Sequence, residues 1–85
     1  MVQACILVKA ESKPSSSSVG RFIDILTGIK KIDNVESAFI VYGRYDLVVF
    51  IDAPSFEDAC KTTYKIHTLP GIESTETSME SKIPL

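Results

Sequence analysis

Two short apolar segments constrain the fold of this chain most strongly. VQACILVKA, at residues 2–10, and DLVVFID, at residues 46–52, are rich in β-branched residues and apolar at consecutive positions. Successive side chains of a strand point to opposite faces of its sheet, so a strand that is apolar at neighbouring positions is covered on both faces. We therefore expect both segments to be central strands of a sheet that has other groups packed on each side.

The helical spacing of apolar residues predicts two helices. The first spans 19–32, and its apolar stripe is formed by Val19, Phe22, Ile23, Leu26 and Ile29. The second begins after Pro54, where Ser55 and Asp58 resemble a capping box. Its buried side is expected to consist of Phe56, Ala59, Cys60, Thr63 and either Ile66 or His67.

The remaining segments predict two edge strands and a loop. Residues 35–42 and 72–81 have strand composition, and the second is mostly Ser, Thr and Glu, as in an edge strand with a solvated face. Residues 11–18, ESKPSSSS, predict a loop. An internal echo, IDNVES at 32–37 and LPGIES at 69–74, places Asn34 and Gly71 at equivalent points, where residues that tolerate positive φ lead from a helix into a strand.

The order βαββαβ, with right-handed crossovers, predicts a single ferredoxin-like α+β domain over residues 1–85, in which a four-stranded antiparallel sheet carries two helices on one face. Apolar side chains of the central strands would then point to the other face, which nothing in the chain is left to cover. A chain of 85 residues has a small core, yet 45% of this one is hydrophobic. We therefore expect a homodimer that associates through the sheet.

Composition argues against several classes of function. The net charge is −2 and there is no cluster of Lys and Arg, so direct binding of nucleic acid is not expected. No apolar run approaches the ~20 residues of a membrane span, and Cys5 and Cys60, which lack CxxC spacing, are expected to be buried free thiols of a cytoplasmic protein. The single imidazole is His67, and no metal-binding or phosphate-binding motif is present. Hence we predict no catalytic residues, no metal, no cofactor and no enzymatic activity.

One polar segment interrupts the apolar strands and is the candidate binding site. Gly43, Arg44, Tyr45 and Asp46 stand between two strands and are compatible with an ordinary hairpin turn. The same four residues also offer backbone N–H groups and a guanidinium for a carboxylate, and a carboxylate for an ammonium group. The residues alone leave both interpretations open.

The pattern VYGRYDLV at 41–48, followed by LPGI at 69–72 and STET at 74–77, resembles the effector-binding RAM domain of the Lrp/AsnC family. The resemblance covers residues 4–79 and includes no helix-turn-helix, which is typical of a stand-alone RAM protein. It implies sheet-to-sheet dimers that associate further into rings, with an amino-acid effector bound between dimers at the hairpin turn. It assigns ligand binding to Gly43, Arg44, Tyr45 and Asp46, and to Thr75 and Thr77 of the last strand.

Three functions are compatible with these features. The first is an amino-acid-sensing, oligomerising module related to the transcriptional regulators of this family, with full-length relatives as candidate partners. The second is a dimeric α+β-barrel enzyme, which would need a buried polar group; the central strands offer only Gln3, Lys9, Asp46 and Asp52, all near their ends. The third is a purely structural assembly protein whose effector site is vestigial.

Overall fold

The six predicted elements are present in the predicted order. A computed structural model describes residues 2–11 and 19–79 of the chain. The elements are β1 (Val2–Ala10), α1 (Val19–Lys30), β2 (Val35–Ile40), β3 (Leu47–Ala53), α2 (Phe56–His67) and β4 (Ile72–Met79). Most of the serine-rich loop predicted at 11–18 lies outside the described residues, as do the last two positions of the strand predicted at 72–81.

The strands form one antiparallel sheet in the order β2-β3-β1-β4. The two apolar strands are therefore central and the other two are edges, as predicted. The register places Ile6 opposite Val49 on β3 and opposite Thr77 on β4. The order β2-β3-β1-β4 confirms the ferredoxin-like βαββαβ fold.

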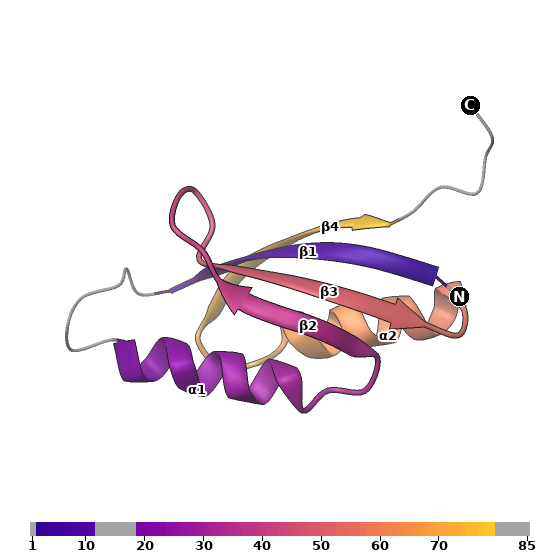
Figure 1. Cartoon of the computed structure of the whole chain (residues 1–85), viewed down its shortest axis with the longest axis horizontal. Helices are drawn as coiled ribbons and strands as arrows, with labels where there is room; N and C mark the ends of the chain where they lie inside the picture. Colours follow the sequence, from indigo (N-terminus) through magenta and orange to yellow (C-terminus); the bar gives the residue numbers. More distant parts are fainter. Residues whose placement is uncertain (1, 12–18, 80–85) are drawn as a thin grey trace.

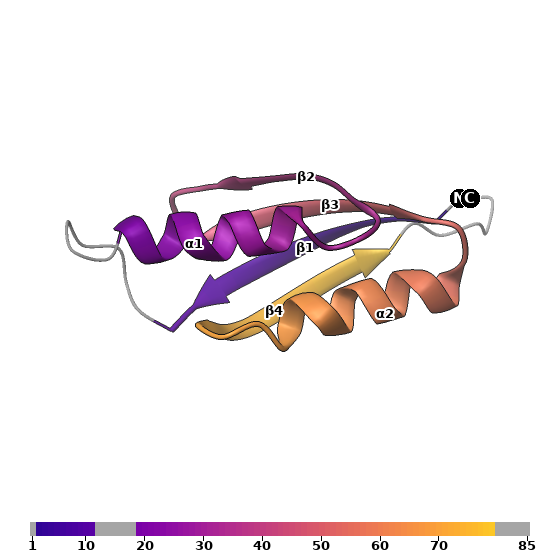
Figure 2. The ribbon, with the colours of Figure 1, turned by 90° about the horizontal axis from the view of Figure 1, so that it is seen from below.

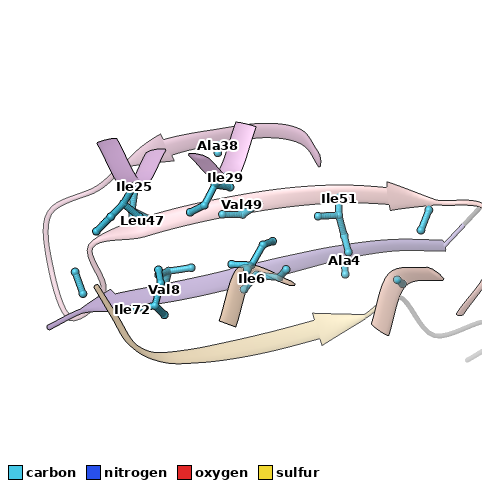
Figure 3. Packing of buried hydrophobic residues seen from close by; sticks show 14 of the residues in the cluster. Ala4, Ile6, Val8, Ile25, Ile29, Ala38, Leu47, Val49, Ile51 and Ile72 are labelled. Carbon is cyan, nitrogen blue, oxygen red and sulfur yellow. The ribbon is translucent and has the colours of Figure 1, made fainter. Parts of the chain in front are cut away.

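Both helices lie on the same side of the sheet, as Figure 1 shows. Figure 2 shows α1 on the β2 side of that face and α2 on the β4 side. Alternate residues of β1 and β3 point into the layer between sheet and helices, and the most deeply buried large side chains come from four elements (Figure 3). These side chains are Ile6, Val8, Ile29, Leu47, Val49, Ile51 and Ile66.

The predicted helix faces are partly wrong. On α1 the buried residues include Phe22, Ile25 and Ile29, whereas Ile23 is 51% exposed. On α2 the buried residues are Ala59, Thr62 and Ile66. Phe56 and Cys60, which were expected to be buried, are exposed instead.

The error on α2 has a specific cause, because its inward face is centred on a polar residue. The Thr62 hydroxyl accepts a hydrogen bond from the Asn34 side-chain amide at 3.2 Å, and it lies 3.4 Å from the Asp33 carbonyl oxygen to which it donates. These bonds satisfy the hydroxyl, so Thr62 can be buried without an unpaired polar group. A hydropathy pattern predicts that such a threonine is exposed to solvent. The buried face of α2 was therefore predicted on the wrong side of the helix.

The internal echo corresponds to a repeated backbone conformation. Asn34 has φ 75° and Gly71 has φ 89°, both in the left-handed region. In each half, the residue redirects the chain from the end of a helix into an edge strand. Ser55 caps α2 as predicted, since its side chain accepts a hydrogen bond from the Asp58 N–H.

Candidate functional site

The face of the sheet that lies away from the helices carries apolar side chains that no other described residue covers. Its aromatic centre is formed by Phe39 of β2 and Phe50 of β3, which are 45% and 40% exposed and whose ring centroids lie 6.0 Å apart. By strand alternation, Cys5, Leu7 and Val48 share this face, and each is half-buried. Within the described part of the chain, a contiguous apolar surface, called the open face below, therefore extends over strands β2, β3 and β1.

A loop at residues 41–46 connects β2 to β3 at one end of this face, and Figure 1 shows it rising away from the helices. The Val41 N–H donates to the Asp46 carbonyl oxygen at 2.9 Å, which closes the base of the loop. The Asp46 N–H donates to the Val8 carbonyl oxygen at 2.9 Å. The Asp46 carboxylate accepts a hydrogen bond from the Ala10 N–H at 2.8 Å. Three bonds thus fix the base of the loop to itself and to β1.

The tip of the loop presents unpaired donors. Gly43 has φ 144°, a conformation that L side chains rarely adopt. Within the part of the chain that the structure describes, nothing accepts a hydrogen bond from the main-chain N–H groups of Gly43, Arg44 or Tyr45. The Arg44 side chain is exposed and forms no ion pair with a described residue. Three successive N–H groups and a guanidinium can together bind a carboxylate.

Tyr45 connects the loop to the far edge of the sheet. Its phenol donates a hydrogen bond to the carboxylate of Glu76 on β4, whose side chain shares the open face. This bond, with some desolvation and the charge of Glu76, raises the pKa of Tyr45 above its ordinary value of 10.0, while Arg44 opposes the shift. The phenol is thus neutral at physiological pH, and an acidic group lies beside the loop at the rim of the open face.

The two threonines implied by the resemblance lie on the opposite face of the sheet. Thr75 and Thr77 alternate with Glu76 along β4 and point to the helix side, where the Thr75 hydroxyl lies 3.2 Å from Nδ1 of His67. The register places Thr75 beside Val8, and strand spacing separates it from β3 by roughly 10 Å. The structure therefore brings Gly43, Arg44, Tyr45 and Asp46 together, but it does not bring Thr75 and Thr77 to them within one chain.

Glu76 is the residue of this region that the sequence analysis missed. Strand alternation could have indicated it, because a residue between two threonines of a strand must face the other way. Among the described residues, no three or more His, Cys, Asp or Glu side chains lie together in a way that could hold a metal ion. In the same residues neither helix has the length and apolar character needed to cross a membrane.

Comparison with known proteins places these features in a family. Residues 3–84 match the model of the Lrp/AsnC ligand binding domain. Hypothetical protein PHS023 from Pyrococcus horikoshii is 28% identical, with a TM-score of 0.77 over 95% of this chain and 90% of that one. TTHA0845 from Thermus thermophilus is 24% identical, with a TM-score of 0.79 over 100% of this chain and 99% of that one.

A longer protein of the same fold carries a ligand in its structure. The transcriptional regulator NMB0573 from Neisseria meningitidis, in complex with L-Met, is 18% identical, with a TM-score of 0.73 over 95% of this chain and 50% of that one. At that identity the likeness concerns the fold alone. A search of proteins of curated function found no match.

Proposed function

Because the chain belongs to the Lrp/AsnC ligand-binding domain family, we propose that it is an effector-binding and oligomerisation module whose effector is an amino acid or a similar zwitterion. The observation that carries the proposal is the set of unpaired donors at the tip of the hairpin loop, formed by the N–H groups of Gly43, Arg44 and Tyr45 and by the Arg44 guanidinium. The ligand carboxylate would bind these donors. The L-Met found in the NMB0573 complex is a molecule of the proposed class.

The acidic side of the site would bind the ammonium group of the ligand. Asp46 lies at the base of the loop and Glu76 lies beside the loop, and each carboxylate already accepts one hydrogen bond, from Ala10 and from Tyr45 respectively. A carboxylate has about four lone-pair sites, so an ammonium group can be added without breaking either bond. The internal bonds fix the positions of the two carboxylates before a ligand arrives, which lowers the entropic cost of binding.

The open face supports the oligomerisation part of the proposal. Phe39 and Phe50 remain about half exposed in one chain, and a second copy packed on the same face would cover them. Oδ1 of Asp52, near one end of this face, is buried and has no hydrogen-bond partner among the described residues. Leaving a buried oxygen without a hydrogen bond costs free energy, and a donor from a second copy would remove this cost. Thr75 and Thr77, which one chain keeps away from the loop, would reach a ligand only from a neighbouring subunit.

A thermal-shift screen against the twenty amino acids tests the binding function, because a ligand of the folded state raises the unfolding temperature by mass action. The best ligand is then titrated by calorimetry into wild type, Arg44→Ala and Lys31→Ala, the last removing an exposed cation next to α1. Arg44→Ala should weaken binding about 10- to 100-fold, as expected for a hydrogen bond to a charged group. Lys31→Ala should bind as wild type does.

The same screen separates this proposal from a purely structural assembly protein with a vestigial site. That alternative is favoured by the internal bonds of Asp46 and Tyr45, which engage two of the polar side chains of the loop. If no amino acid raises the unfolding temperature, or if Arg44→Ala and wild type bind equally well, the structural alternative replaces the proposed function.

A further inference from the structure

A cavity of about 500 Å³ lies on the helix side of the sheet, where α1, the end of β1 and the connection from α2 to β4 come together. Its described lining residues are Glu11, Asp24, Ile25, Gly28, Leu69, Pro70 and Gly71. None of these residues belongs to the hairpin loop or to the open face. Ligand cavities in proteins have volumes of about 300 to 1,000 Å³, so this one is large enough for a small organic molecule.

The wall of the cavity is mostly apolar side chains and main chain, and two carboxylates supply its charge. Ile25 is buried and Leu69 is half-buried. Glu11 and Asp24 are exposed, and within the described part of the chain neither carboxylate has an ion pair or a hydrogen bond. The described lining residues include no Lys, Arg or His. Such a wall is complementary to a cation that carries an apolar group.

Gly28 leaves the cavity open on the side of α1. It follows Asp24 and Ile25 by about one turn, so the three residues share one side of the helix. Glycine inside a helix is less stable than alanine. A Cβ built on Gly28 would have no described atom within 4 Å apart from its neighbours along the helix. Packing among the described residues therefore does not require glycine here, whereas a ligand in the cavity can approach the bare main chain of α1.

From the volume, the apolar wall and the unpaired acids we propose that this cavity binds a small organic cation, namely a protonated amine that carries an apolar group. The apolar group would lie against Ile25 and Leu69, with the ammonium group beside Glu11 and Asp24. An amino acid of the same skeleton has a carboxylate, which the two acids would repel. The cavity therefore differs in ligand class from the hairpin loop, and the inference goes beyond the proposed function and does not depend on it.

Glycine amide resonances in a nitrogen–proton correlation spectrum of the full chain report on the cavity and on the hairpin loop separately. Gly28 and Gly71 line the cavity, whereas Gly43 lies in the loop. Phenethylamine at millimolar concentration should shift the resonances of Gly28 and Gly71 in a saturable manner. The absence of a shift at both glycines, or shifts confined to residues of the open face, would overturn the proposal.

Two compounds of the same skeleton test the selection for a cation. Phenethyl alcohol lacks the charge, and it should bind at the cavity roughly two- to fivefold more weakly than phenethylamine, as expected for the loss of an exposed ion pair. Phenylalanine adds a carboxylate and should bind there more weakly still. Equal affinities of the three compounds, measured from the Gly71 resonance, would show that the cavity does not select a cation and would overturn the proposal.

Removal of the carboxylates tests their role. Glu11→Gln and Asp24→Asn keep the shape of each side chain and remove its charge, so each should weaken phenethylamine binding roughly two- to fivefold. Glu57→Gln, which removes an exposed carboxylate of α2 outside the cavity, is the matched control and should bind as wild type does. An equal loss in Glu57→Gln, or no loss in either cavity variant, would overturn the proposal.

Filling the cavity tests its location. Gly28→Leu adds a side chain next to Asp24 and should abolish the shift at Gly71. Thr27→Leu, at an exposed neighbouring position that is not among the lining residues, should leave the shift unchanged. Circular dichroism establishes that each variant is folded, and Gly28→Ala replaces Gly28→Leu if the latter is not. A folded Gly28 variant that binds phenethylamine as tightly as wild type overturns the proposal.

Discussion

Both faces of the sheet carry apolar side chains, but these side chains lie in very different environments. Toward the helices, Ile6, Leu47 and Val49 have no exposed surface, whereas on the open face Phe39 and Phe50 remain 45% and 40% exposed. Val49 and Phe50 are neighbours on one strand, and their side chains point to opposite faces of the sheet. The difference shows that residues 2–11 and 19–79 supply a cover for one face alone, and the apolar surplus on the other is explained if it is buried between subunits.

Val49→Asp should have the largest effect, because it places a carboxylate among buried apolar side chains without a partner. We expect a loss of at least about 4 kcal/mol in the free energy of unfolding. Small domains have about 5–15 kcal/mol in total, so the variant should be largely unfolded by circular dichroism at 25 °C. A variant that folds with wild-type stability would place Val49 outside the core.

Phe50→Asp should separate association from folding. The carboxylate would point into solvent in the single chain, so the fold should be retained, but it would be buried without a partner in a dimer packed through the open face. Size-exclusion chromatography should show a shift to a smaller species, and the unfolding midpoint should lose its dependence on protein concentration. Phe50→Leu, which keeps the face apolar, is the matched control and should still associate. A folded Phe50→Asp variant of wild-type size would contradict the role of this face.

Much of the fold follows from the sequence because its signals are redundant. The two segments apolar on both faces define the centre of the sheet, and the polar composition of residues 74–78 defines an edge. Side-chain direction was harder to predict. Ile23 and Ile25 are equally apolar, so composition could not decide which one packs against the sheet, and the burial of Thr62 depends on hydrogen bonds from residues far along the chain.

The candidate site was predicted less completely than the fold. The segment from Gly43 to Asp46 was found because polar residues interrupt apolar strands, and its local geometry follows from the positive φ of Gly43. The hydrogen bond from Tyr45 to Glu76 joins residues 31 positions apart, and no local pattern indicates it. Whether Thr75 contributes to the binding site depends on how a neighbouring subunit is placed, and the sequence of one chain does not specify that placement.

Asp46→Ala should affect the loop rather than the core. It removes the carboxylate that accepts a hydrogen bond from the Ala10 N–H at 2.8 Å, in a partly buried site. A hydrogen bond to a charged group contributes about 1.5–3 kcal/mol. We therefore expect the free energy of unfolding, measured by urea denaturation, to fall by an amount of that order. Hydrogen exchange at Ala10 should accelerate more than exchange at Ile6 in the centre of β1. Unchanged exchange at Ala10 would show that this bond does not hold the loop to the sheet.

Tyr45→Phe should have the smallest effect on the free energy of unfolding, and this effect should depend on pH. The folded-state pKa of Tyr45 is raised above 10.0 by its bond to Glu76, so the bond stabilises the folded state below pH 10 and is lost as the pH rises through the raised pKa. The difference in unfolding free energy between wild type and Tyr45→Phe should therefore be present at pH 7–9 and decline at higher pH. A difference that grows above pH 10 would contradict this assignment.

Sedimentation equilibrium of the wild-type chain at micromolar concentration tests most directly whether the open face is a subunit interface. We expect a mass of at least twice the 9.3 kDa of one chain, and we expect Phe50→Asp to dissociate toward 9.3 kDa. A compact wild-type species of 9.3 kDa, unchanged as the protein concentration is raised, would contradict it.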